Sequence, residues 1–134
     1  MFETSIKGDT MKDHMIGHCP MACEKLNGFM SRVGDRWSVL VILTLSDMGV
    51  MRFNEMKRHL GITQRMLSRT LRELERDGLV SRTVHDSVPP HVDYQLTPLG
   101  ESFGDPIRYL GEWALKHLDQ IDTARADFDA KHPD

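Results

Sequence analysis

The sequence has few cysteines and lacks long apolar runs. Its 134 residues include 2 cysteines, which are too few for a disulfide framework and are interpreted as thiols, ligands or redox sensors. The longest apolar run, residues 39–43, is far shorter than the roughly 18 residues that span a bilayer. The N-terminus has no basic flank followed by an apolar stretch, as a secretory signal would. We therefore expect a cytoplasmic protein with no membrane partner.

The features of common catalytic sites are absent as well. The 7 histidines are scattered, no glycine-rich phosphate loop occurs, and no nucleophile stands beside a base in a recognisable context. The sequence also has no internal repeat and no low-complexity tract. We expect a protein that is not an enzyme, has no catalytic residue and needs no cofactor.

The composition favours one folded domain with appended ends. With 40% hydrophobic and 28% charged residues, the chain has enough apolar material for a core and too little net charge for wholesale disorder. Residues 1–18 lack clear periodicity and are expected to form a partly ordered arm. Residues 119–134 hold five acidic and two basic side chains and are expected to be a frayed or disordered tail. The domain should span residues 19–118.

Charge is distributed unevenly along the chain. The formal net charge is −3, from 17 Lys and Arg against 20 Asp and Glu, which by itself disfavours a nucleic-acid binder. Residues 52–82, however, hold eight basic and four acidic side chains, a local charge of +4, and the remainder carries −7. The domain is therefore polarised and can present a basic face.

Hydrophobic periodicity predicts a mainly helical domain with one β-hairpin. Gly34 should end the first helix in the left-handed conformation, and Asp35, Thr63 and Thr97 can cap the helices that follow them. After Gly78 the period changes from 3.6 to 2, which predicts strands. The expected order is helices near residues 26–33, 37–45, 54–60 and 64–77, strands near 80–85 and 92–96 around a loop at 87–91, and a helix from 98 to about 118 with a kink near 104–106.

The helix after Thr63 has two opposite faces. Leu67, Leu71 and Leu74 recur at spacings of 4 and 3, and arginines repeat this pattern two residues earlier. At about 100° per residue, the arginines lie roughly 200° from the leucines, so one face belongs to the core and the other is cationic. Polar side chains on such a helix read base edges, and Arg is the commonest reader of guanine. The candidate groove-facing residues are Thr63, Gln64, Arg65, Ser68, Arg69 and Arg72.

The neighbouring elements complete a winged helix-turn-helix. The short helix at residues 54–60, the turn at Gly61 and the arginine-faced helix form a helix-turn-helix. The hairpin that follows forms a wing, from which Arg82, His85 and His91 approach phosphates or the minor groove. The fold class is therefore mainly α with a small β-hairpin wing.

Two other interpretations of the cationic face stay open. Glu73 and Glu75 could pair with the arginines at i,i+3 or i,i+4 spacing, which would make this an ordinary solvated face. A winged helix could also serve protein contacts alone. The order of short helix, turn, cationic helix and hairpin favours double-stranded DNA as the partner.

Motifs spread over residues 19–113 match those of a known family. They are Cys19-Pro20; Gly34 with Arg36-Trp37; Arg52-Phe53-Asn54-Glu55; Ile62-Thr63-Gln64-Arg65-Met66-Leu67; Leu71-Arg72-Glu73-Leu74-Glu75 with Asp77-Gly78-Leu79-Val80; Val88-Pro89-Pro90 with Tyr94, Leu96-Thr97 and Leu99-Gly100; and Glu112-Trp113. With these motifs the sequence resembles the HxlR-type winged helix-turn-helix regulators, which are relatives of the MarR regulators.

The resemblance implies a homodimeric transcription regulator, with the first and last helices at the dimer interface and the two recognition helices in successive major grooves of a pseudo-palindromic operator. The sequence departs from the family at two points. The family often has a basic residue where His91 stands, and its helix proline usually falls one residue before Pro106.

The resemblance also suggests a sensing thiol. In several relatives, the cysteine that matches Cys19 is a redox or electrophile sensor, which implies a repressor that responds to such a signal. A helix N-terminus or a nearby cation lowers the pKa of a thiol. Cys23 could resolve an oxidised Cys19, but Cβ atoms at i,i+4 on a helix lie about 5–6 Å apart, beyond the ~3.5–4.5 Å of a disulfide. A bond between two chains is therefore favoured over one within a chain.

Three alternatives to the thiol switch remain. Cys19 and Cys23 could be unreactive packing residues, or a small-molecule effector could act on the same fold. A run of soft ligands could also bind a metal, with His14 and His18 at the i,i+4 spacing of a helical metal pair. Because that run has no Cys-x-x-Cys pair and no carboxylate at fixed spacing, we predict no metal site. The run comprises Met11, His14, Met15, His18, Cys19, Met21 and Cys23.

Overall fold

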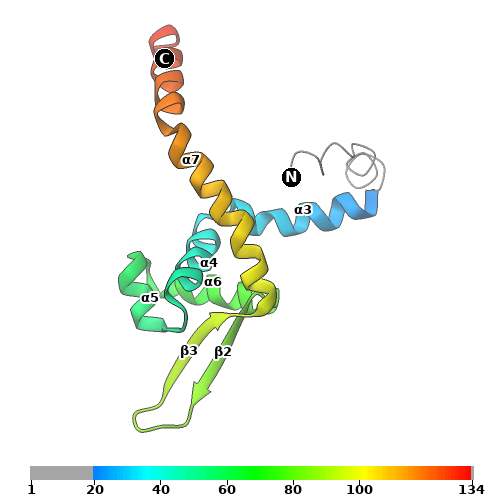
Figure 1. Cartoon of the computed structure of the whole chain (residues 1–134), viewed down its shortest axis with the longest axis vertical. Helices are drawn as coiled ribbons and strands as arrows, with labels where there is room; N and C mark the ends of the chain where they lie inside the picture. Colours follow the sequence, from blue (N-terminus) through cyan, green and yellow to red (C-terminus); the bar gives the residue numbers. More distant parts are fainter. Residues whose placement is uncertain (1–19, 134) are drawn as a thin grey trace. The chain divides into compact units, whose positions relative to one another are not determined.

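The computed structural model describes residues 20–133 of the chain, and these fall into two units, residues 20–39 and 40–133. No helix in the described part is both long enough and apolar enough to cross a bilayer. In chain order, the elements are α3 (Pro20–Gly34), α4 (Arg36–Met48), β1 (Met51–Arg52), α5 (Phe53–Leu60), α6 (Gln64–Arg76), β2 (Val80–His85), β3 (His91–Leu96) and α7 (Pro98–Lys131) (Figure 1).

The first unit contains α3 and the start of α4. Asp35 caps α4 as predicted, because its Oδ1 accepts a hydrogen bond from the Trp37 N–H at 3.2 Å and its Oδ2 accepts one from the Ser38 hydroxyl at 2.9 Å. Gly34 ends the first helix as predicted, but the expectation of a left-handed conformation there was wrong. Gly34 is the last residue of α3 and does not have a positive φ. Only one residue separates α3 from α4, and the Asp35 cap rather than a left-handed glycine marks the break.

The core of the second unit joins α4, α5, α6, the sheet and the start of α7. Its buried side chains come from all of these elements, so α6 is held on one side by apolar contacts with the rest of the unit. The buried apolar residues are Val41, Ile42, Leu45, Met51, Met56, Ile62, Leu67, Leu71, Leu74, Leu79, Val80, Tyr94, Leu96 and Ile107.

The sheet has three antiparallel strands in the order β1-β3-β2. The hairpin of β2 and β3 was predicted, whereas β1 was missed because it is only two residues long and pairs with a distant strand, Met51 opposite Tyr94. β3 begins at His91, which the sequence predicts to lie in the loop, and His91 pairs directly with His85 of β2. The loop holds a cis peptide bond between Val88 and Pro89.

Both ends of α6 are fixed by local hydrogen bonds. At the start, the Thr63 hydroxyl accepts a hydrogen bond from the Met66 N–H at 3.2 Å, which confirms the predicted cap. At the end, the Leu79 N–H donates to Leu74 O and the Gly78 N–H to Glu75 O, with Gly78 at φ 80°. This is a Schellman motif, for which glycine is the usual residue because it has no Cβ.

The start of α7 is joined to the end of α6. The Thr97 hydroxyl accepts a hydrogen bond from the Gly100 N–H at 3.0 Å and donates one to Gly78 O at 2.6 Å, so the predicted Thr97 cap is confirmed and also holds the two helices together. Gly100 lies so close to the Leu79 backbone that a Cβ there would collide with Leu79 O. The wing, α6 and α7 thus meet at one tight junction.

α7 is longer than the sequence suggested. It continues to Lys131 instead of ending near residue 118, and Pro106 lies inside it. Between Gly111 and Pro133 the sequence contains no glycine and no proline, so nothing interrupts helix propagation once the helix has formed. The residues 119–131 that were expected to fray are therefore helical, and most of them are exposed.

Candidate nucleic-acid interface

The two faces of α6 separate as the leucine and arginine spacings predicted. Leu67, Leu71 and Leu74 are 0 to 2% exposed, whereas every polar residue proposed to face DNA from this helix and its cap is exposed. These are Thr63, Gln64, Arg65, Ser68, Arg69 and Arg72. The cationic face is therefore free of the core and is held rigidly by the apolar face beneath it.

One arginine of this face is engaged by a carboxylate. Arg69 Nε lies 3.6 Å from Glu73 Oε2 at i,i+4 spacing, and the Arg69 side chain is 70% exposed. An exposed pair of this kind is worth only about 0.3–0.5 kcal/mol. Within residues 20–133, no ion pair joins Arg65 or Arg72 to a carboxylate. Pairing with a glutamate, which the sequence left open for the arginines of this face, therefore occurs at Arg69. Arg65 and Arg72 remain available to contact a partner.

A cavity of about 340 Å³ lies between α6 and the sheet. Ser68 and Arg72 line it from α6, and Arg82 lines it from β2. The structure therefore brings together three of the predicted residues, from two elements, at one polar surface. A phosphate or a base edge at this surface would meet hydrogen-bond donors from both the recognition helix and the wing.

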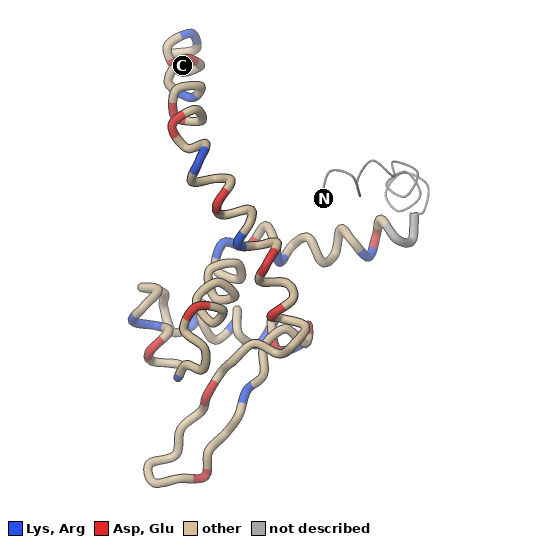
Figure 2. Tube along the Cα trace, viewed as in Figure 1, with Lys and Arg blue, Asp and Glu red and all other residues tan. Residues whose placement is uncertain are grey.

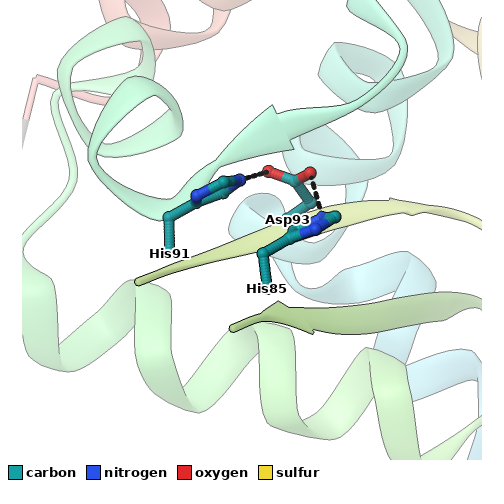
Figure 3. Close-up of side chains that lie close together, drawn as sticks. All are labelled: His85, His91 and Asp93. Atoms are coloured by element: carbon teal, nitrogen blue, oxygen red, sulfur yellow. Dashed lines mark ion pairs between the residues drawn. The ribbon is translucent and has the colours of Figure 1, made fainter. Parts of the chain in front are cut away.

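The wing histidines lie differently from the prediction. His85 and His91 were expected to approach phosphates, but both imidazoles point to Asp93 on β3 (Figure 3). His85 Nε2 is 2.8 Å from Asp93 Oδ2, His91 Nε2 is 3.8 Å from Asp93 Oδ1, and the two rings stack with centroids 4.5 Å apart. Their first contact is with a carboxylate of the wing itself.

Two further cations lie beside the wing and were not assigned a role from the sequence. Arg52 and Arg58 line a cavity of about 650 Å³ together with His91 and the loop residue Pro90. Both arginines had been counted in the basic segment, but only the pairing of β1 with β3 places them beside the hairpin. Basic positions mark α5 and β2, whereas acidic and basic positions both recur along α7 (Figure 2).

The predicted sensing thiol is outside the described residues. Cys19 immediately precedes α3, which begins at Pro20. Cys23 is the fourth residue of α3, at the end of its first turn, and is half-buried. The other members of the soft-ligand run that precede residue 20 also lie outside the described residues.

Comparisons with known proteins identify the family. The model of the HxlR-like helix-turn-helix family matches residues 32–122. The uncharacterized HTH-type transcriptional regulator YtfH of Escherichia coli (strain K12) is 36% identical over 97 residues, which cover 72% of this chain and 76% of that protein.

Solved structures of similar proteins support the same family. The redox regulator HypR in its reduced form has a TM-score of 0.67 and 36% identity, covering 74% of this chain and 98% of that chain. Diamide-treated YodB from Bacillus subtilis has a TM-score of 0.60 and 34% identity, covering 73% and 93%. With its winged helix-turn-helix, the chain belongs to the HxlR-like helix-turn-helix family and is a transcriptional regulator rather than an enzyme.

Proposed function

We propose that this cytoplasmic regulator binds a pseudo-palindromic operator as a homodimer, with α6 of each chain in a major groove. The observation that carries the proposal is the exposed cationic face of α6, opposite three buried leucines. A helix fixed in this way can present Gln64, Arg65 and Ser68 near its N-terminal end to base edges, while Arg82 meets the backbone. His91 belongs to the wing part of the same proposed surface.

The homodimer is supported by large apolar side chains on α3 and α7 that remain exposed in the structure. α3 exposes Leu26, Phe29 and Met30, which lie within one turn of each other. α7 exposes a second set, Tyr109, Leu110, Trp113, Leu115, Leu118 and Phe128. Large apolar surfaces of this kind mark interaction sites, and the family resemblance implies that the first and last helices contact a second copy of the chain.

Replacing Arg65 tests the proposed DNA-binding face. We expect Arg65→Ala to weaken binding to a selected operator duplex by about 1–3 kcal/mol, because a bidentate contact to guanine is lost. The matched control is Arg125→Ala, an exposed arginine on α7. Fluorescence anisotropy of a labelled duplex measures the DNA affinity of both variants. If Arg65→Ala binds as tightly as the parent, this face of α6 is not the reader.

We further propose that the protein is a repressor whose operator affinity changes when Cys19 is oxidised. The likeness to HypR, which is named a redox regulator, and the position of Cys19 directly before a helix support this role. In the simplest case, Cys19 thiols of two chains form a disulfide, and an added diamide takes up the two protons and two electrons that they lose.

The thiol proposal is tested by operator binding of the parent, Cys19→Ser and Cys23→Ser, each reduced and after diamide treatment. We expect diamide to change the affinity of the parent and of Cys23→Ser and to leave Cys19→Ser unchanged. Non-reducing electrophoresis shows whether chains are joined. An equal response of the parent and Cys19→Ser would exclude Cys19 as the switch.

A further inference from the structure

Three potential metal ligands converge at the end of the wing. The register pairs His85 with His91 across β2 and β3, and directly opposed residues of an antiparallel pair project from the same face. Asp93 follows His91 by two residues, so it shares that face as well. The ligand atoms of all three side chains lie within 4.8 Å of one another (Figure 3).

From this arrangement we propose that His85, His91 and Asp93 form a site for a divalent transition-metal ion of the zinc type. Two imidazoles and one carboxylate are a common catalytic-type zinc set that leaves the fourth position open. Bonds of about 2.0–2.2 Å place tetrahedral ligand atoms roughly 3.3 Å apart. His85 Nε2 and Asp93 Oδ2 are already 2.8 Å apart, and the imidazole of His91, whose Nε2 lies 3.8 Å from Asp93 Oδ1, has to rotate out of its stack with His85 to complete the set.

The exposure of the three side chains suits ion entry. The side chains of His85, His91 and Asp93 are 42, 24 and 23% exposed, so an ion can reach them from solvent without opening the core. The two imidazoles are held by strands that pair with each other, which limits the freedom lost when a metal joins them.

A hydrogen-bond chain prepares His91 for this role. The Ser87 hydroxyl donates to Pro89 O at 2.9 Å and lies 3.3 Å from His91 Nδ1. Because that hydroxyl proton is already directed at Pro89 O, the contact is satisfied when His91 Nδ1–H donates to Ser87 Oγ. This tautomer leaves a lone pair on Nε2, the atom turned to Asp93. Metal-binding histidines are commonly oriented through their second nitrogen in this way.

The position of the site gives it a role, which rests on the proposed function. Residues 80–96 carry one arginine and two aspartates, a formal charge of −1. A bound divalent ion changes this to +1 and joins the two ends of the loop at residues 86–90. Its open coordination position can take a phosphate oxygen. A metal-loaded wing is thus expected to bind DNA more tightly than a metal-free one.

Titration of the DNA-free full chain with Co²⁺ tests the site separately from DNA binding. The parent for this experiment carries His14→Ala, His18→Ala, Cys19→Ser and Cys23→Ser, which removes the histidine and cysteine ligands near the N-terminus. We expect one Co²⁺ per chain, detected by its visible absorption and displaced by Zn²⁺. His85→Ala, His91→Ala and Asp93→Asn should each weaken binding at least about tenfold.

The matched control is His59→Ala, an exposed histidine on α5, which should bind Co²⁺ as the parent does. Circular dichroism checks the fold, and Asp93→Asn keeps the size of the side chain. A parent that does not bind Co²⁺, or ligand variants that bind it equally well, would overturn the site. If Co²⁺ binds at these residues but Zn²⁺ leaves operator affinity unchanged, the site stands and its role at DNA is overturned.

Discussion

α6 and the wing are both proposed to meet DNA, yet they are built differently. α6 carries four arginines and two glutamates over residues 64–76, a formal charge of +2, whereas residues 80–96 of the wing carry −1. α6 rests on three buried leucines, whereas the wing is exposed along residues 82–84 and 86–90 and half-buried at His85 and at residues 91–93. The comparison suggests that α6 supplies fixed, specific contacts to DNA. The wing adds weaker contacts to DNA, whose strength depends on which cation neutralises the carboxylate of Asp93.

The largest expected effect is on stability and separates the two regions. Leu67→Ala should lower the free energy of unfolding by about 2–5 kcal/mol, because it removes a fully buried side chain of α6. The wing counterpart, Val84→Ala, removes a side chain that is 59% exposed and should cost no more than about 0.5 kcal/mol. Urea denaturation measures both. Equal losses would mean that the wing is packed as tightly as α6.

A smaller effect distinguishes backbone contacts from base contacts. Arg82→Ala on the wing should weaken binding to all duplexes by a similar factor and reduce the salt dependence of binding by about one phosphate contact. Arg65→Ala should instead weaken binding most for the preferred sequence. Affinities for selected and scrambled duplexes at several salt concentrations test the difference. A sequence-selective loss for Arg82→Ala would place a base reader in the wing.

The smallest effect concerns the cap of α6. Thr63→Ala should cost about 1 kcal/mol of stability, because the Met66 N–H loses its acceptor. Thr63→Ser keeps the hydroxyl and should retain most of that stability. Thermal unfolding compares the two. If both variants are as stable as the parent but bind DNA more weakly, Thr63 acts as a DNA contact rather than as a cap.

Local patterns were sufficient to predict α6. The leucine and arginine spacings, the Thr63 cap and the glycine at its end are all features of neighbouring residues, and the structure has each of them. The Asp35 and Thr97 caps were predictable for the same reason. Elements that depend on hydrogen bonds between near neighbours can be recognised from the sequence alone.

Features that depend on strand register were not predictable. The sequence around Pro89 and Pro90 does not define the first residue of β3. His91 was therefore predicted to lie in the loop, and its pairing with His85 was missed. The convergence of both histidines on Asp93 follows only from that register. β1 and the neighbourhood of Arg52 were missed because this pairing joins segments about 40 residues apart.

Base preference is the most direct test of the central claim that the cationic face of α6 reads the operator. Duplexes are selected from a random library with the full-length parent and with Arg65→Ala, and then sequenced. The account predicts that the parent enriches two related half-sites about one helical turn apart. Arg65→Ala should lose the preference at one position in each half-site. Unchanged preference at every position would contradict the account.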